Sequence, residues 1–478
     1  MSIAKHSKQK KEELKMNEIE AVGTMDNIDL SAKSIANRIT RISQKILLTA
    51  VKHCGTSVKF IHVSHNDQDG YGCSVVMKSL YTYMDSARSF MVNPAIKQFN
   101  TPLMVPKTYE TIDMAIEQAL ADPNHKPMVV LITDFGNITM EDIVKRYRYA
   151  NHGDIKFVIL DHHKSPYAEL NPGKIQFTKT GFIKGADSFL YYDEKREAYY
   201  GSYSDGPNFQ IYEIITDDEK TSATKLLYNV VTYGHKRKFE IKDKKYLERL
   251  ADYAELVSIY DTGRFGNWYV PVSTDPTWRN WYEKNVAPEI KLLYVWKAYA
   301  NMPTGKHQKG SNMQEYIDVM SYTLLHGKDN IFMAIASAVI YTAIMELSED
   351  YNQFCEELHS VLDAGESTDE TVTYVLDNST INGNDVQAKM IIPKSMNVAK
   401  NNIVTFHSLY TDRNPFTLFA KKYLTDHPDV YLVAKVRFNK DRTVSVDMRG
   451  NTDHANCYEI AKLNGGGGHP GAAGYPVI

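Results

Sequence analysis

Short apolar runs alternate with amphipathic segments through the first third of the chain. The runs at 58–64, 127–135 and 155–163 read VKFIHVS, PMVVLITDF and IKFVILDHH. Near-continuous apolar strands are typical of a parallel sheet that is covered on both faces. Between these runs, segments 110–120 and 140–151 repeat their apolar residues with helical spacing. This alternation predicts an α/β fold built on a doubly wound, mainly parallel sheet.

Three further segments of the same half are predicted to be helices, and one is not. Segment 31–53 repeats isoleucine at helical spacing, and segment 220–233 has Thr221 as its candidate N-cap. Segment 244–265 has the same helical periodicity. Segment 175–220 is instead rich in Tyr, Gly and Asp, and we interpret it as an inserted hairpin region.

The last quarter of the chain predicts a second, smaller α/β domain. Its apolar runs have strand length and are followed by a helix and a glycine-rich loop. The predicted strands lie at 371–377, 386–393, 430–438 and 443–449, and the helix at 457–464. A helix at 330–362 is predicted to connect this domain to the preceding part of the chain.

These patterns divide the chain into four predicted parts. They are a polar extension with a helix at 1–53, a larger α/β domain at 54–300 with the 175–220 insert, a helical linker at 301–365, and the smaller α/β domain at 366–478. A length of 478 residues fits more than one core.

Composition narrows the class of protein. The charged fraction of 24% and the hydrophobic fraction of 43% are those of a soluble globular protein. The net charge of −3 gives no global attraction to long nucleic-acid duplex. The four cysteines form no CxxC pair, which argues against a zinc finger or a disulfide scaffold and favours a reducing cytoplasm. Neither a transmembrane helix nor a signal peptide is expected, and we expect no membrane partner.

Acidic and histidine residues follow each of the three predicted parallel strands. They are His65, Asp67, Asp69, Asp134, Asp161, His162 and His163. In such sheets ligands bind at the carboxyl ends of the strands, and these side chains are ligands that divalent metals accept. Taken alone, each motif also fits a polar turn or a helix cap. Together they predict a metal site, in which Gly70 and Gly72 allow a tight turn into the next helix.

Three details of this set bear on metal binding. A single Asp, such as Asp134, can bridge two ions. Successive histidine side chains diverge, so one of His162 and His163 can bind metal while the other faces a phosphate, and Asp161 can orient one of them. Asp261 ends a predicted helix, where the helix dipole opposes a carboxylate. A nearby cation would compensate for this, although a solvated loop Asp is an equal alternative.

A glycine-rich loop near the C-terminus carries one histidine. It reads GGGGHPGAAG at 465–474, with His469 inside it, and Arg449 follows the last predicted strand. Exposed backbone N–H groups beside His and Arg favour an anion such as phosphate, while a flexible C-terminal turn is the alternative.

The order of these motifs resembles that of a known family. HNDQDG, ITDFG, LDHHK and YD, followed by GGGGHPGAAG, resemble the DHH phosphoesterase superfamily with its DHH-associated C-terminal domain. Four local sequences are most similar to the nanoRNase B type of oligoribonuclease: SHNDQDGYGC, LDHHKS, TSATKLLY and ELVSIYDT. The resemblance covers about 58–265 and 370–478.

The resemblance implies a set of site residues. The site would bind two divalent ions, and the expected metal is Mn(II). The ligands would be Asp67, Asp69, Asp134, His162 and Asp261, with Asp134 bridging the two ions and His65 as a further ligand. Several family branches place the first His four residues before the first Asp, whereas here it lies two before Asp67. The catalytic residues would be Asp161, His162 and His163, with His163 on the scissile phosphate.

The same resemblance implies that the C-terminal domain binds the substrate. Substrate contacts would come from His163 in the first domain and from Arg449, Gly466, Gly467, Gly468 and His469 in the second. VSVDMRG resembles the Ser-x-Arg segment of the family, but this chain has Asp447 in place of the serine.

The implied activity is a two-metal phosphodiesterase that hydrolyses short single-stranded oligonucleotides to mononucleotides in the cytoplasm. Its partners would be short single-stranded RNA or DNA or small nucleotides, and a homodimer is left open. Three alternatives remain: a RecJ-type exonuclease on single-stranded DNA, a phosphoesterase for cyclic dinucleotides or nucleoside 3′,5′-bisphosphates, and a non-enzymatic nucleotide-binding scaffold.

Overall fold

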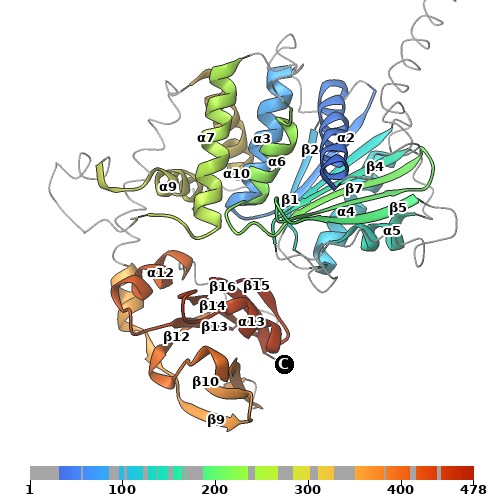
Figure 1. Ribbon diagram of the computed structural model, residues 1–478. Coiled ribbons are helices and arrows are strands. Elements are labelled where there is room, and N and C mark those ends of the chain that lie inside the picture. Colours follow the sequence, from blue (N-terminus) through green and yellow to red (C-terminus); the bar gives the residue numbers. More distant parts are fainter. Residues whose placement is uncertain are drawn as a thin grey trace, which may run out of the picture. The chain divides into compact units, whose positions relative to one another are not determined.

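The chain divides into two compact units in its computed structural model (Figure 1). The first comprises Met1–Phe265 and Val295–Ala336, and the second Gly266–Tyr294 and Ser337–Ile478. The structure describes residues 32–54, 57–84, 96–101, 105–121, 127–136, 138–148, 154–163, 167, 187–234, 243–266, 268, 284–301, 311–327, 350–381, 384–409, 416–438 and 443–477. The predicted boundaries of the four parts stay predictions.

A seven-stranded sheet organises the first unit, in the order β2-β1-β3-β4-β7-β6-β5. The strands are β1 (Lys59–His65), β2 (Ile96–Thr101), β3 (Met128–Thr133), β4 (Ile155–Asp161), β5 (Asp187–Asp193), β6 (Ala198–Ser204) and β7 (Phe209–Thr216). The first five in this order run parallel, and β6 and β5 add an antiparallel edge. Every residue of β3 and β4 is buried, as their continuous apolar sequences predict.

Helices cover both faces of this sheet (Figure 1). Helices α4 (Val105–Leu120) and α5 (Met140–Tyr147) pack on one face through the main apolar core of the unit. Helices α2 (Ala32–His53), α3 (Gln68–Met84) and α6 (Ala223–Val231) lie on the other. The doubly wound, mainly parallel α/β fold is therefore confirmed.

Two more helices pack outside α3. They are α7 (Lys244–Asp261) and α10 (Ser311–His326), while α9 (Pro288–Asn301) spans the division between the units. The hydroxyl of Ser321 in α10 donates to the backbone oxygen of Val75 in α3. No helix among the described residues is long and apolar enough to cross a membrane.

The predicted elements of the first unit differ from the observed ones in three places. Helix α3 begins at Gln68, so Asp69 lies within its first turn. Helix α6 has Ser222 as its N-cap instead of Thr221. In segment 175–220 the expected hairpin exists as β5 and β6, but β7 is the fifth parallel strand of the main sheet, and its last six residues are all buried. Residues 328–349, which include most of the helix predicted at 330–362, lie outside the described residues.

The second unit contains two sheets that share one apolar core. The smaller sheet has the order β11-β10-β9, and the larger has the order β15-β16-β14-β13-β12-β8. Their strands are β8 (His359–Ser360), β9 (Asp363–Ser367), β10 (Thr371–Ile381), β11 (Asn384–Pro393), β12 (Ile403–Leu409), β13 (Leu432–Phe438), β14 (Val444–Gly450), β15 (Gly467–His469) and β16 (Ala472–Val477). Helices α12 (Phe416–Asp426) and α13 (Cys457–Leu463) also lie in this unit. All four predicted strands and the helix predicted at 457–464 are present.

Candidate metal centre

The register of the parallel strands brings three predicted site segments to one edge of the sheet. Ser64 of β1 pairs with Thr133 of β3, and Thr133 pairs with Leu160 of β4. The next residue of each segment is His65, Asp134 or Asp161. The site residues therefore start from the same level, at the carboxyl ends of three adjacent strands.

His162 lies at the meeting point of three carboxylates. Its Nε2 is 3.2 Å from Oδ1 of Asp134, 3.4 Å from Oδ2 of Asp69 and 3.4 Å from Oδ2 of Asp261. These acids come from the segment after β3, the first turn of α3 and the last residue of α7. Asp261 is separated from the other acids by most of the domain in sequence, and the fold brings it to them.

A second group lies beside the first and shares Asp134 with it. His65 Nδ1 is 2.7 Å from Oδ2 of Asp67 and 3.8 Å from Oδ2 of Asp134. The backbone N–H of Gly70 donates to Oδ1 of Asp67 at 2.9 Å. Candidate ligand atoms lie within 4.8 Å of one another in the set His65, Asp67 and Asp134 and in the set Asp69, Asp134 and His162. One carboxylate common to two sets is the arrangement that a two-ion site requires.

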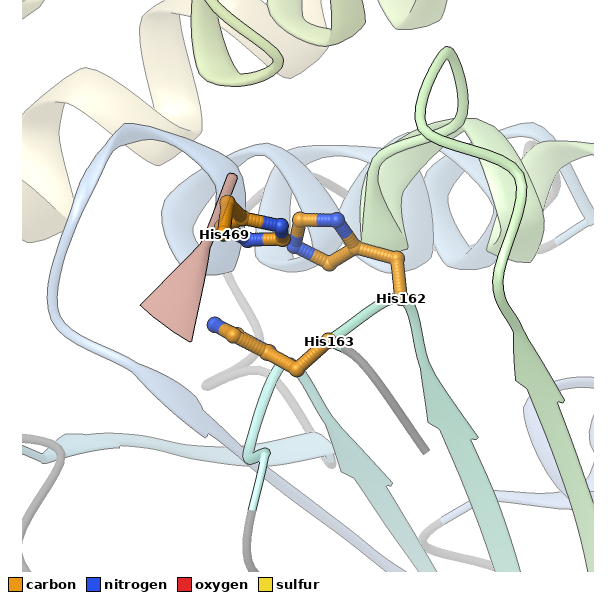
Figure 2. A group of neighbouring side chains, drawn as sticks. All are labelled: His162, His163 and His469. Carbon is orange, nitrogen blue, oxygen red and sulfur yellow. The ribbon is translucent and has the colours of Figure 1, made fainter. Parts of the chain in front are cut away.

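The Asp161 carboxylate holds the second histidine of the DHH triplet. Its Oδ1 lies 2.8 Å from Nδ1 of His163 and accepts backbone N–H groups from His162 and His163. Figure 2 shows both imidazoles leaving the end of β4, with ring centroids 4.7 Å apart. His162 faces Asp134, Asp69 and Asp261, whereas the nearest carboxylate to His163 is Asp161. Oδ1 of Asp134 lies between the two rings, 3.2 Å from His162 Nε2 and 3.9 Å from His163 Nδ1.

Asp134 has a strained backbone. Its φ of +64° falls in the left-handed region, where residues other than glycine are uncommon. Its N–H nevertheless donates to Leu160 O on β4 at 3.1 Å, which keeps the turn against the sheet. Such strain persists where the surrounding structure fixes it, often at functional sites. Here it turns a carboxylate that is 1% exposed into the middle of the cluster.

Burial and mutual repulsion disfavour the ionised forms of two carboxylates in the cluster. Burial, followed by the charges of Asp67, Asp69 and Asp261, raises the pKa of Asp134 well above its usual value. Burial and the charges of Asp69 and Asp67 do the same to the pKa of Asp261. Among the described residues, Oδ2 of Asp134 and Oδ2 of Asp261 are buried without a hydrogen-bond partner. Two orphaned, buried carboxylate oxygens beside histidine nitrogens fit divalent cations.

His65 and Asp67 behave as a pair within this cluster. Burial alone would lower the pKa of His65, but the Asp67 charge and hydrogen bond outweigh it, and the pKa is raised. Burial would likewise raise the pKa of Asp67, but the His65 charge and hydrogen bond lower it. Protonated His65 and ionised Asp67 therefore favour each other, and a bound cation would compete with the imidazolium for the carboxylate.

Asp69 is held in place by hydrogen bonds that the sequence did not predict. The backbone N–H groups of Ala223 and Thr224, at the start of α6, donate to Oδ2 and Oδ1 of Asp69 at 2.7 and 2.9 Å. The Thr224 hydroxyl donates to the Asp69 backbone oxygen at 2.7 Å. The signal in the sequence is the segment TSATKLLY, which carried the family resemblance without a role.

Gly70 and Gly72 are required for a different reason from the predicted one. They lie inside α3, where a Cβ on Gly70 would be 2.0 Å from the backbone oxygen of His65, and a Cβ on Gly72 would be 2.3 Å from the Thr224 hydroxyl. Glycine is therefore needed for the close approach of α3 to β1 and α6, and not for a turn before the helix.

The predicted substrate residues of the second unit share one sheet face. Arg449 of β14 pairs with Ala472 of β16, which pairs with His469 of β15, so the three side chains leave the same face. Arg449 donates from Nη2 and Nε to the Thr417 hydroxyl at 2.7 and 3.2 Å, and its guanidinium lies 5.3 Å from the Phe416 ring centroid.

The glycine run of this unit is partly strand. Gly467–His469 form β15, although a flexible loop was expected. A Cβ on Gly466 would lie 2.1 Å from Gly474 O, and Gly468 has a φ of +138°. Pairing with β16 thus explains Gly466 and Gly468, while Gly467 has open space where a Cβ would be. Their role toward a substrate stays a prediction.

Comparison with known proteins gives a match to the fold. No protein-family model and no curated protein matches the sequence. Among solved structures, a DHH domain described as belonging to a family of ribosomal proteins matches 99% of this chain and 94% of its own, with a TM-score of 0.54 and 13% identity.

Two other structures are similar at a lower level. A pGpG-specific phosphodiesterase from Vibrio cholerae matches 88% of this chain and 94% of its own, with a TM-score of 0.35 and 12% identity. RecJ from Thermus thermophilus in complex with Mg²⁺ matches 92% of this chain and 50% of its own, with a TM-score of 0.37 and 9% identity. The match to the DHH domain confirms the expected resemblance at the level of the fold: this chain has the fold of a DHH-domain protein.

Proposed function

We propose that this chain is a member of the DHH phosphoesterases that hydrolyses short single-stranded oligonucleotides, RNA in particular, to mononucleotides. The observation that carries the proposal is the buried cluster at the carboxyl edge of the parallel sheet, in which Asp134 belongs to three overlapping sets of candidate metal ligands, two of which supply ligands proposed below. The cluster has four carboxylates, and their ion-pair partners among the described residues are histidines. Burial and neighbouring acids raise the pKa of Asp134 and of Asp261, so a bound cation would favour the ionised forms of these two groups.

The cations are two divalent ions, with Mn(II) as the proposed metal. His65, Asp67 and Asp134 would hold one ion, and Asp69, Asp134, His162 and Asp261 the other. Two such ions supply Lewis acidity toward phosphate oxygens and lower the pKa of the attacking water. The α6 amides that hold Asp69 and the Leu160 carbonyl that accepts from Asp134 keep these carboxylates in place without a metal.

His163 is proposed to contact the scissile phosphate. Its Nδ1 faces Oδ1 of Asp161 at 2.8 Å, so Nε2 is the nitrogen that would reach a substrate. A histidine held in one orientation by a carboxylate can donate a proton or a hydrogen bond to an anionic oxygen at a fixed position. Asp161 therefore serves as the residue that orients His163.

The second unit is proposed to bind the nucleotide. Arg449 and His469 leave the same face of the six-stranded sheet, and Gly466, Gly467 and Gly468 precede the histidine. Arginine is suited to a phosphate because its planar guanidinium offers paired donors. Asp447, which replaces the serine of the family pattern, pairs with Arg437, so it differs from a hydroxyl in charge as well as in shape.

A time course on labelled strands tests the proposal. RNA and DNA of two to about twenty-four nucleotides, labelled at the 5′ end, would be incubated with Mn(II), with Mg(II) and with chelator, beside the variant Asp134→Asn. Rapid Mn(II)-dependent loss of the shortest RNAs, absent in the variant, is the expected result. Preferential degradation of long DNA would move the assignment to a RecJ-type exonuclease. No cleavage of any strand would refute the oligonucleotide assignment and direct tests to cyclic dinucleotides and nucleoside bisphosphates.

A further inference from the structure

One buried carboxyl group in the same sheet is not among the proposed metal ligands. Glu213, in β7, is 0% exposed. The backbone N–H of Met140 donates to its Oε1 and the Tyr167 hydroxyl to its Oε2, both at 2.9 Å. Burial raises the pKa of Glu213 to about 8, so the group is mostly protonated at neutral pH. A protonated carboxyl can remain in the interior without a counter-ion: Oε1 accepts from Met140, and the proton on Oε2 can be donated to the Tyr167 hydroxyl oxygen.

The two partners of Glu213 follow the two segments that carry the site. Met140 is the first residue of α5, the helix that follows the segment with Asp134. Tyr167 follows the segment with Asp161, His162 and His163. One side chain therefore joins the far ends of both segments, while their near ends are fixed by the adjacent strands β3 and β4.

The surroundings of Glu213 are fitted to this contact. Gly201 lies opposite it on β6, and a Cβ there would be 3.0 Å from Oε2 of Glu213. On the other side, Thr139 caps α5 in a reciprocal capping box with Asp142, so the amide of Met140 is held at a helix N-terminus. The Tyr167 ring packs against Tyr199 with centroids 5.7 Å apart. The carboxyl, the amide and the hydroxyl are thus each fixed by a separate element.

The two joined segments also touch each other near the chemistry. A Cβ on Gly136, in the segment after β3, would lie 2.9 Å from the Cβ of His163. His162 Nε2 and Asp134 Oδ1, one from each segment, are 3.2 Å apart. A change in the spacing of the segments would therefore change the distance between the candidate ligands directly.

We propose that Glu213 is a positioning residue of the metal centre: through Met140 and Tyr167 it holds the segment of Asp134 against the segment of Asp161, His162 and His163. The inference rests on the metal centre of the proposed function, and it adds two residues, Glu213 and Tyr167, that touch neither metal nor substrate. Outer residues that orient metal ligands affect metal affinity strongly.

The test measures metal binding apart from hydrolysis. Mn(II) affinity would be measured by calorimetry, and the low-temperature EPR spectrum of the loaded protein recorded, for the full chain and four variants. Glu213→Leu is expected to weaken Mn(II) binding about tenfold, and Tyr167→Phe several-fold, with a changed EPR spectrum. Glu213→Gln keeps a neutral polar group of the same shape and should restore near-normal affinity.

Tyr246→Phe is the matched control. Tyr246 is a fully buried tyrosine whose hydroxyl is 2.9 Å from that of Ser79, away from both segments. The Tyr246→Phe protein should be destabilised as the Tyr167→Phe protein is, but its Mn(II) affinity should be unchanged. If Glu213→Leu and Tyr167→Phe also keep wild-type affinity and spectrum, Glu213 is purely structural and the inference is wrong. The expected effects on binding without any hydrolysis would refute the proposed function alone, and a wild-type chain that binds no Mn(II) would refute both.

Discussion

Thr224 makes two hydrogen bonds to Asp69: its backbone N–H donates to Oδ1 at 2.9 Å, and its hydroxyl donates to the backbone oxygen at 2.7 Å. The first fixes the carboxylate at the positive end of α6, and the second fixes the backbone of α3 beside it. A proposed metal ligand is thus oriented by a helix that begins far later in the chain.

Replacement of Thr224 by valine tests this support. Thr224→Val keeps the shape of the side chain and leaves the buried oxygen of Asp69 without its hydroxyl donor, which should cost about 1–2 kcal/mol of unfolding free energy. Mn(II) affinity should fall several-fold, because Asp69 is less firmly placed. Denaturant unfolding and calorimetry measure the two effects. Thr224→Ser, which retains the hydroxyl, should show neither, and equal losses in both variants would contradict the role of the hydrogen bond.

Gly70 should tolerate no side chain. A Cβ there would meet the backbone oxygen of His65 at 2.0 Å, and a backbone atom cannot move aside as a flexible side chain can. Gly70→Ala is therefore expected to destabilise the fold by roughly 3 kcal/mol and to displace His65 and Asp67. Gly467→Ala, where nothing lies within 4 Å, is the control for stability. A Gly70→Ala protein with an unchanged melting temperature would show that α3 can shift away from β1.

Much of this arrangement could be predicted from the sequence, because it depends on local sequence patterns and on the general geometry of parallel sheets. Continuous apolar runs predicted β3 and β4, and the residues that follow parallel strands necessarily gather at one edge. This rule predicted that His65, Asp134 and Asp161 would lie close together. Asp261 was a candidate on two grounds: a carboxylate at a helix C-terminus opposes the dipole, and the YD motif belongs to the family resemblance.

The remainder depends on contacts between distant segments. No local pattern says that α6 would place its first amides on Asp69, or that Glu213 would join Met140 and Tyr167. The Tyr-, Gly- and Asp-rich composition of segment 175–220 predicts an inserted hairpin, but it does not say that a strand of this segment joins the parallel sheet. Strand β7 was identified by its register with β4, which sequence spacing does not encode.

Glu213 should make stability depend on pH. Its pKa rises from the usual 4.5 to about 8 on folding, mainly by burial. The stabilising contribution of the protonated group is therefore fully present below about pH 4.5 and is lost as pH rises through about 8. Relative to Glu213→Gln, which does not titrate, the wild-type chain should lose a few kcal/mol of unfolding free energy over this window. Urea unfolding at several pH values measures the difference.

The contrast for that experiment is Glu255. Its hydrogen bond to Lys225 lowers the pKa of Glu255, so the ionised form is the one that the fold favours. Its contribution is present above the usual pKa and is lost as the pH falls, which is the opposite sign from Glu213. Because Glu255 is partly exposed, the effect of Glu255→Gln should be small. A stability difference for Glu213→Gln that does not vary with pH would show that the carboxyl keeps one protonation state throughout.

Arg449 should act on substrate binding and not on the metal. Two of its guanidinium nitrogens donate to the Thr417 hydroxyl, which a lysine cannot reproduce. Arg449→Lys is expected to raise KM for short oligonucleotides about tenfold, with Mn(II) affinity unchanged, because the loss is confined to the anion contact. Steady-state kinetics on a trinucleotide measures this. A normal KM would remove Arg449 from the substrate site.

Removal of the Asp134 charge should have opposite effects on stability and on activity. Without a cation, Asp134 is a buried carboxyl group whose pKa is raised by burial and by three neighbouring acids. Asp134→Asn should therefore stabilise the metal-free chain by about 1 kcal/mol or more at neutral pH. Activity should fall by about a thousandfold, because the bridging ligand of both ions is lost.

The response of stability to Mn(II) separates a ligand from a merely buried acid. The wild-type chain should gain thermal stability as the ion concentration rises, because only the folded chain offers the site, and Asp134→Asn should gain little. Thermal unfolding with graded Mn(II) and with chelator gives both slopes. Glu213→Gln, which replaces a buried acid outside the proposed ligand set, is the matched comparison and should respond as the wild type does. Equal Mn(II)-dependent shifts in the wild type and in Asp134→Asn would remove Asp134 from the metal centre.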